Sequence, residues 1–168
     1  MSTLDSLGSH AADDAEVAAR ALAYLGSHHC MSVATDGPHG LWAATVFYVN
    51  RSFVLHFLSL SDSRHARNIE SNPRVAATIG PDAEDWGKVS GVQLEGRAAR
   101  IYDPDEHRAV MAAFTERYPF ADCLWWWTGT SLGPGTQRFL YRVEPARMFF
   151  VDHGFRSARF EVAARHLP

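Results

Sequence analysis

Residues 41–74 read LWAATVFYVNRSFVLHFLSLSDSRHARNIESNPR, and they contain the clearest structural signals of the chain. Aromatic and β-branched residues fill positions 41–49 and 53–60, which predicts a strand in each. A short polar turn, Asn50-Arg51-Ser52, separates the two strands, so we expect them to pair as an antiparallel hairpin.

A polar turn and a short helix follow this hairpin. The helix is expected within residues 61–70, where Asp62 or Ser63 can cap its first amides, and Asn72-Pro73 ends it. The amides of a helix start, the serine hydroxyls beside them and the guanidinium of Arg64 are groups that bind anions. The same residues also fit an ordinary capped surface helix, so they leave both interpretations open.

Two further helices flank these strands in the sequence. One is expected over residues 13–26, after a polar and flexible terminus at residues 1–10. The other begins at Asp103, which can cap it, and runs to about residue 118. Pro104 suits its first position, and Glu106 can complete a capping box. The apolar face of the first helix is predicted to consist of Val17, Ala21, Leu22 and Leu25.

Short strands account for most of the remaining chain. They are expected at residues 30–35, 74–80, 88–102, 137–143, 146–151 and 155–162. The connections are short, and the helices are too few to separate every strand pair. The sequence therefore predicts a mainly β, α+β fold: a single domain over residues 1–168, built as an antiparallel β-barrel with a few flanking helices.

Composition narrows the range of functions. The 168 residues carry a net charge of −3, which is unfavourable for general electrostatic binding of nucleic acid. No run of about 18 apolar residues suggests a membrane span, and the first residues do not resemble a signal peptide. We therefore expect a cytoplasmic protein without nucleic-acid or membrane partners.

The order of three motifs resembles a known superfamily. These motifs are the paired strands of residues 41–60, the Ser63-Arg64-His65 turn with the helix and NPR segment after it, and the GVQLEG strand at residues 91–96. Together they are similar to the pyridoxamine 5'-phosphate oxidase-like, FMN-binding split β-barrel superfamily, and most similar to an uncharacterised bacterial branch of it. The resemblance covers roughly residues 20–101.

The resemblance implies a homodimer with FMN at the interface. It also implies an oxidoreductase that transfers hydride between the flavin and a small-molecule substrate or nicotinamide donor. It assigns the flavin phosphate to Ser63, Arg64 and His65. The flavin ring and ribityl chain would lie against residues carried over from the two strands and, more weakly, from the GVQLEG segment. These residues are Thr45, Val46, Phe57, Leu58, Ser59 and Gln93.

Several alternatives remain open at this point. The cofactor could instead be a deazaflavin or haem, bound for storage or sensing without turnover, or the barrel could have lost its cofactor and serve as an interaction module. His65 stands where the superfamily often has a second cation, so phosphate affinity could depend on pH. Residues 155–168 show no convincing counterpart of the cationic substrate site of pyridoxamine phosphate oxidases, so we do not expect that activity.

Three other features have competing interpretations. His56 is either a buried core histidine or a haem ligand. Trp125, Trp126 and Trp127 either pack against the barrel or the dimer partner, or form a wall over the flavin. No metal site is expected at residues 28–30, because neighbouring side chains of a strand point to opposite faces.

Overall fold

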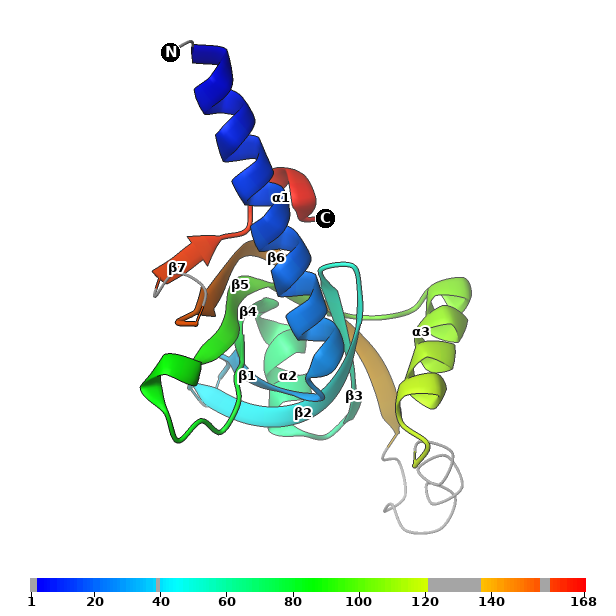
Figure 1. The fold of residues 1–168 in the computed structure, drawn as a ribbon. Coiled ribbons are helices and arrows are strands. Elements are labelled where there is room, and N and C mark those ends of the chain that lie inside the picture. The colour runs from blue at the N-terminus through cyan, green and yellow to red at the C-terminus, as the bar shows by residue number, and fades with distance from the viewer. Residues whose placement is uncertain (1–2, 39, 121–136, 155–157) are drawn as a thin grey trace.

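The computed structural model describes residues 3–38, 40–120, 137–154 and 158–168. Its strands form one antiparallel sheet that closes into a barrel, because β3 pairs with β6 as well as with β2 (Figure 1). The order across the sheet is β3-β2-β1-β4-β5-β6-β7, and β7 extends the sheet beyond the closed part. The predicted antiparallel split barrel is therefore confirmed. The strands are β1 (Cys30–Thr35), β2 (Trp42–Arg51), β3 (Val54–Leu60), β4 (Arg74–Ile79), β5 (Ser90–Arg100), β6 (Arg138–Asp152) and β7 (Ala158–Glu161).

The central hairpin forms as the sequence predicts. β2 and β3 pair antiparallel with Arg51 opposite Val54, and Ser52 in the turn adopts a left-handed φ of 54°. β1 pairs antiparallel with both β2 and β4. Buried and more exposed side chains alternate along β1 and β4, as the pleat of a strand requires.

The closing strand differs from the prediction. β6 is continuous over Arg138–Asp152, so the predicted break between residues 143 and 146 is wrong. Pro145 lies within this strand at an irregularity of the β5–β6 pairing, where the register shifts between Glu95 and Gly96. A bulge accepts a residue that cannot donate a ladder hydrogen bond, so the proline bends the strand without ending it.

Three α-helices lie on the outside of the barrel, α1 (Thr3–Ser27), α2 (Arg64–Ser71) and α3 (Pro104–Arg117), with 3-10 turns at Trp86–Lys88 and Ala164–His166. α1 begins at Thr3, ten residues before its predicted start at Asp13, and so includes most of the segment that was expected to be a flexible terminus. Asp103 caps α3 as predicted, accepting hydrogen bonds from the amides of Asp105 and Glu106. In the described part of the chain, no helix combines the length and the apolarity needed to cross a membrane.

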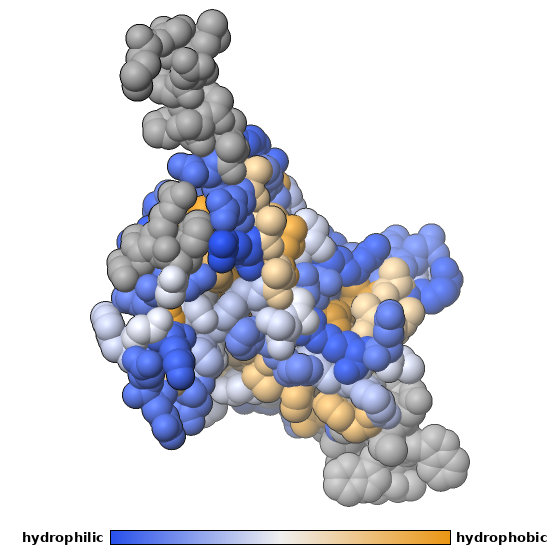
Figure 2. Space-filling model, in the orientation of Figure 1, coloured by the Kyte–Doolittle hydropathy of each residue, from blue (hydrophilic) through white to orange (hydrophobic). Residues whose placement is uncertain are grey.

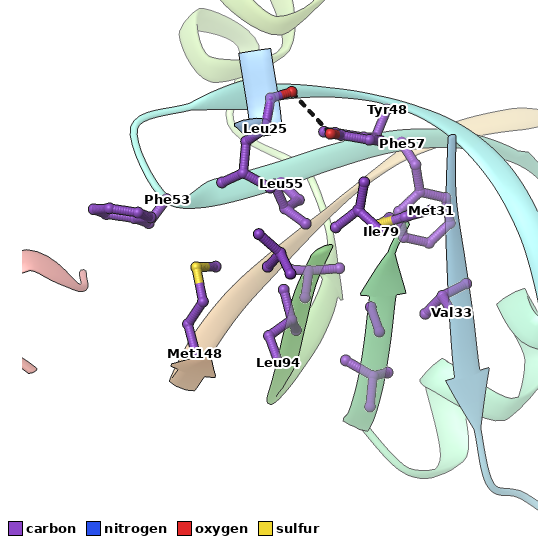
Figure 3. Packing of buried hydrophobic residues seen from close by; sticks show 14 of the residues in the cluster. Leu25, Met31, Val33, Tyr48, Phe53, Leu55, Phe57, Ile79, Leu94 and Met148 are labelled. Atoms are coloured by element: carbon purple, nitrogen blue, oxygen red, sulfur yellow. Dashed lines mark hydrogen bonds between the residues drawn. The ribbon is translucent and has the colours of Figure 1, made fainter. Parts of the chain in front are cut away.

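The barrel interior holds the main hydrophobic core. Figure 3 shows residues from α1 and several strands converging on it, and the hydroxyl of Tyr48 donates a 2.8 Å hydrogen bond to the carbonyl of Leu25. A second, smaller cluster lies between α3 and the outer side of the barrel, centred on Val110 and Phe114. The main core fixes the barrel, whereas the smaller cluster fixes the position of α3.

Candidate functional site

A cavity of about 350 Å³ lies where β2, β3 and α3 meet. Its size is within the range of small-molecule and cofactor sites. Six of the nine residues assigned by resemblance line it. The full lining is Thr45, Val46, Phe47, Leu58, Ser59, Leu60, Ser63, His65, Phe114, Tyr118, Phe120 and Arg138.

The turn from β3 into α2 forms the polar end of this cavity. The hydroxyl of Ser59 lies 2.9 Å from that of Ser63 and 2.5 Å from Nε2 of His65. Ser63 is the N-cap of α2 and accepts a hydrogen bond from the amide of Ala66, as the sequence predicts. The Ala66 amide is occupied by this cap, whereas the amides of Arg64 and His65 have no acceptor within the helix and add donors to this end of the cavity.

His65 occupies the polar end as a neutral imidazole at neutral pH. Burial lowers its pKa below the ordinary value of 6.5, because the protonated ring would lose hydration. The ring of Phe57 lies on another side of it, with centroids 6.1 Å apart. A neutral imidazole has one donor nitrogen and one acceptor nitrogen, and a bound anion would favour its protonated form.

The cation that lines the cavity beside these groups is Arg138. It lies opposite Leu60 in the β3–β6 pairing, which brings the first residue of β6 to the β3–α2 turn. Sequence reasoning missed this residue. The sequence around an arginine at the start of a predicted strand does not show which strand it will pair with. Here the paired residues are 78 positions apart in the sequence.

Arg64, by contrast, does not line the cavity. Its guanidinium lies 3.5 Å from the carbonyl oxygen of Gly40 and 3.4 Å from that of Leu41. It also stacks over the ring of Trp42, 4.8 Å from the ring centroid. The assignment of Arg64 to a phosphate remains a prediction, and it requires this side chain to leave the positions described here.

The other end of the cavity is apolar. Val46 and Leu58 contribute from the strands, and Phe114, Tyr118 and Phe120 form a wall on the α3 side. Sequence reasoning predicted the helix that carries Phe114, but it missed that this wall faces the assigned strand residues. Helical periodicity shows which face of α3 is apolar, but not which strands that face covers.

Two contacts fix this aromatic wall to the barrel. The hydroxyl of Tyr118 donates to the carbonyl of His29 at 3.0 Å and also reaches the carbonyl of Tyr48. The neighbouring Arg117 bonds the carbonyls of Leu25 and Gly26 at 3.1 and 2.9 Å, where α1 ends. The end of α3 is therefore tied to α1 and β2, and the wall keeps a fixed orientation.

Phe57 and Gln93 lie outside the cavity. The side chain of Phe57 points into the barrel core and stacks on Tyr141. Gln93 is exposed on the outer face of β5, and the pairings place Ser32 and Thr78 between it and Thr45. With about 4.8 Å between neighbouring strands, Gln93 and Thr45 are separated by roughly 14 Å across this face.

His56 also lies away from the cavity. It is 2% exposed, and its Nε2 lies 3.7 Å from a carboxylate oxygen of Glu106. The other oxygen of Glu106 accepts a 2.9 Å hydrogen bond from Arg142, so the predicted capping-box role of Glu106 is wrong. Burial lowers the pKa of His56 to about 4. It is a buried histidine at the α3 interface, while Trp125, Trp126 and Trp127 lie outside the described residues.

A protein-family model described as pyridoxamine 5'-phosphate oxidase matches residues 17–152. The chain belongs to this family. Within the pyridoxamine 5'-phosphate oxidase family, the match spans α1 to the end of β6 and therefore includes every residue that lines the cavity. It extends well beyond the motifs that first suggested the resemblance, so α3 and its aromatic wall belong to the matched region.

Individual relatives are more distant. A UPF0306 protein of Photorhabdus laumondii is 26% identical over 98 residues, which is 57% of this chain and 68% of that protein. A haem-binding protein of Mycobacterium smegmatis superposes with a TM-score of 0.69 at 22% identity, covering 89% of this chain and 58% of the other. HutZ, the haem storage protein from Vibrio cholerae, gives a TM-score of 0.60 at 20% identity, covering 75% of this chain and 88% of the other. At these identities the two solved structures show the shared fold alone.

Proposed function

We propose that this chain is an FMN-binding oxidoreductase that works as a homodimer. The observation that carries the proposal is the polarity of the cavity: hydroxyls, an imidazole and a guanidinium gather at one end, and apolar side chains line the rest. FMN has a matching distribution, with a dianionic phosphate at one end and a flat, largely apolar ring at the other.

The donor set fits a phosphoryl group. Ser59, Ser63 and His65 would hold its oxygens together with the first amides of α2, and Arg138 would supply the permanent positive charge. Val46 and Leu58 would exclude water from one side of the ring, and the backbone around Thr45 would contact its polar edge. When bound, the flavin would supply the hydride chemistry, while these residues hold and orient it.

The outer face of the sheet supports a dimer. Alanine, serine and threonine side chains fill neighbouring positions on β1, β2 and β4, so this face is flat and open to close approach. Leu41, Trp42 and Phe47 are exposed beside it, and Figure 2 shows apolar residues gathered along the lower edge of the barrel, over β2. A second copy covering this face would bring its own Gln93 toward the cavity that one chain leaves open.

The first test is the spectrum of the purified protein. We expect a yellow protein with an absorbance band at about 450 nm, or uptake of added FMN that produces this band. Anaerobic reduction by NADH or NADPH then separates an oxidoreductase from a binding protein. A colourless protein that takes up no FMN contradicts the proposal.

A second test concerns the dimer. The substitution Ala76→Arg places a bulky charge on the small-residue face, so we expect it to shift the protein from dimer to monomer in analytical ultracentrifugation and to weaken FMN binding. Glu84→Arg, on an exposed loop that lines none of the described pockets, is the control and leaves both properties unchanged. A wild-type monomer at micromolar concentration would remove the dimer from the proposal.

The pH dependence of binding tests His65. A bound phosphate raises the pKa of His65 from its lowered value in the free protein, so binding takes up a proton. FMN affinity should therefore fall as pH rises through the interval between the lowered pKa of His65 in the free protein and its raised pKa in the complex, by up to roughly tenfold per pH unit, the limit for one proton. Fluorescence titrations measure this slope. His65→Gln should flatten it, and an equally steep slope in that variant excludes His65 as the linked group.

Haem is the second candidate cofactor. His65 is a neutral imidazole that lines a largely apolar cavity, and such rings coordinate iron. Its Nε2 atom is already bonded to Ser59, so iron bound at that atom would have to displace this contact. A strong absorbance band at about 400 nm in place of the flavin band would favour haem.

A further inference from the structure

The α3 side of the cavity carries a cluster of aromatic rings with exposed surface. Phe47, Tyr118 and Phe120 contact one another pairwise, with ring centroids between 5.2 and 5.4 Å apart. Phe47 is 48% exposed and Phe120 is 43% exposed, although both line the cavity. Rings held at such distances present edges and faces on which another flat ring can stack.

The cluster offers a ligand ring surface and few hydrogen bonds. The hydroxyl of Tyr118 is already donated to main-chain carbonyls, so it is directed away from the cavity. Phe114 lies against Tyr118 at 5.6 Å and adds a further apolar side chain to the same wall. A ligand covering these rings would be held by stacking and by the removal of apolar surface from water.

Apart from Arg138 and His65, no basic side chain among the described residues lines the cavity. Of the two arginines of α3, Arg108 pairs with Asp105 at 2.7 Å. Arg117 lies 5.8 Å from the ring centroid of Tyr118, and its guanidinium is hydrogen-bonded to carbonyls at the end of α1. Residues 121–136, which join the wall to β6, include no lysine, arginine or histidine. Arg138 lies with the serines and His65 at the other end of the cavity.

We propose that this aromatic wall binds an uncharged, flat aromatic ring, and that it rejects aromatic ligands carrying a carboxylate or phosphate at this end. A negative charge against Phe114 and Phe120 would lose hydration without gaining a partner, whereas a neutral ring loses nothing comparable. The wall faces the strand residues assigned to the flavin, so we identify this ring as part of the substrate that exchanges hydride with the flavin. That identification rests on the proposed function. The ring site itself follows from the wall and the placement of charge.

Binding of two matched probes to the FMN-saturated protein tests the inference. The probes are 2-naphthol, which is neutral at pH 7, and 2-naphthoate, which has the same ring system and a carboxylate. Calorimetry and ligand-observed NMR should show 2-naphthol binding at least tenfold more tightly than 2-naphthoate. Equal affinities, or tighter binding of 2-naphthoate, would overturn the inference.

Two substitutions at Phe120 locate the site. Phe120→Ala should weaken 2-naphthol binding at least fivefold, and Phe120→Arg should shift the preference toward 2-naphthoate by adding the missing cation. Trp86→Ala removes an aromatic ring that is 75% exposed and remote from the cavity, so it should leave both affinities unchanged. If Phe120→Ala leaves naphthol binding unchanged, the ring does not bind at this wall.

The outcomes separate this inference from the proposed function. FMN uptake together with no discrimination between the probes overturns the inference and leaves the proposed function intact. A protein that takes up no FMN contradicts the proposed function, and the same titrations on the cofactor-free protein then decide the ring site. Preference for 2-naphthol in that protein supports the site, and its absence overturns it.

Discussion

Arg138→Ala should raise the Kd for FMN by roughly ten- to a hundredfold, which corresponds to about 1.5–3 kcal/mol for the loss of a charge-assisted hydrogen bond. Arg138 lines the cavity beside the Ser59, Ser63 and His65 cluster. A dianionic phosphate bound to neutral donors alone would lack a compensating charge, so this arginine should contribute more than any one hydroxyl. Fluorescence titration of FMN measures the effect.

Two comparisons make this result specific. Arg138→Lys keeps the charge but not the planar fork, so we expect an intermediate Kd. Arg64→Ala should have a smaller effect than Arg138→Ala, because Arg64 contacts the carbonyls of Gly40 and Leu41 and the ring of Trp42. A larger effect from Arg64 would mean that this side chain turns toward the phosphate on binding, as the family resemblance implies. Urea unfolding of each variant checks that the fold is intact.

The substitution Gly96→Ala should lower the free energy of unfolding by about 3 kcal/mol, the scale of a severe backbone clash. A Cβ atom at Gly96 would lie 2.1 Å from the carbonyl oxygen of Glu144 and 2.9 Å from Cα of Pro145. Both are backbone atoms of the bulged strand, so no side-chain rotation relieves the contact. The barrel can accept the methyl group only if the β5–β6 pairing moves apart.

Gly26→Ala provides the matched control. Gly26 lies in α1, and a Cβ atom there meets nothing within 4 Å. Alanine is the better helix former, so this change should be neutral or stabilise the protein by up to about 1 kcal/mol. Urea denaturation at equilibrium compares the two variants. If Gly96→Ala is as stable as Gly26→Ala, the bulge is less constrained than the contacts imply.

The sequence predicted most elements of the barrel because strands and turns carry local signals. Alternating apolar residues and short polar turns located β1 to β4 within a few residues of their observed ends. The exceptions have non-local causes. The sequence around Pro145 indicated a strand end, but the bulge opposite Gly96 accommodates the proline. Glu106 was predicted to complete a capping box, but its carboxylate accepts a hydrogen bond from Arg142 of β6 instead.

The residues of the candidate site fall into the same two groups: those close together in the sequence and those brought together only by the fold. Ser59, Ser63 and His65 lie within seven residues, so the local turn brings them together and the sequence could identify them. Arg138 and Phe120 reach the same cavity only through the closure of β3 on β6 and the docking of α3. Neither the β3–β6 pairing nor the docking of α3 produces a recognisable pattern in the sequence, because each joins segments that are far apart along the chain.

By itself, the sequence determined the strands, the turns and the donor-rich start of α2, since each arises from residues that are neighbours along the chain. The tertiary structure decided which cation lies beside those donors, which aromatic face opposes them, and that Gln93 is too far from Thr45 to reach the same cavity in one chain. These features depend on strand register and helix packing. Both are fixed by burying the whole apolar surface together, which no single segment encodes.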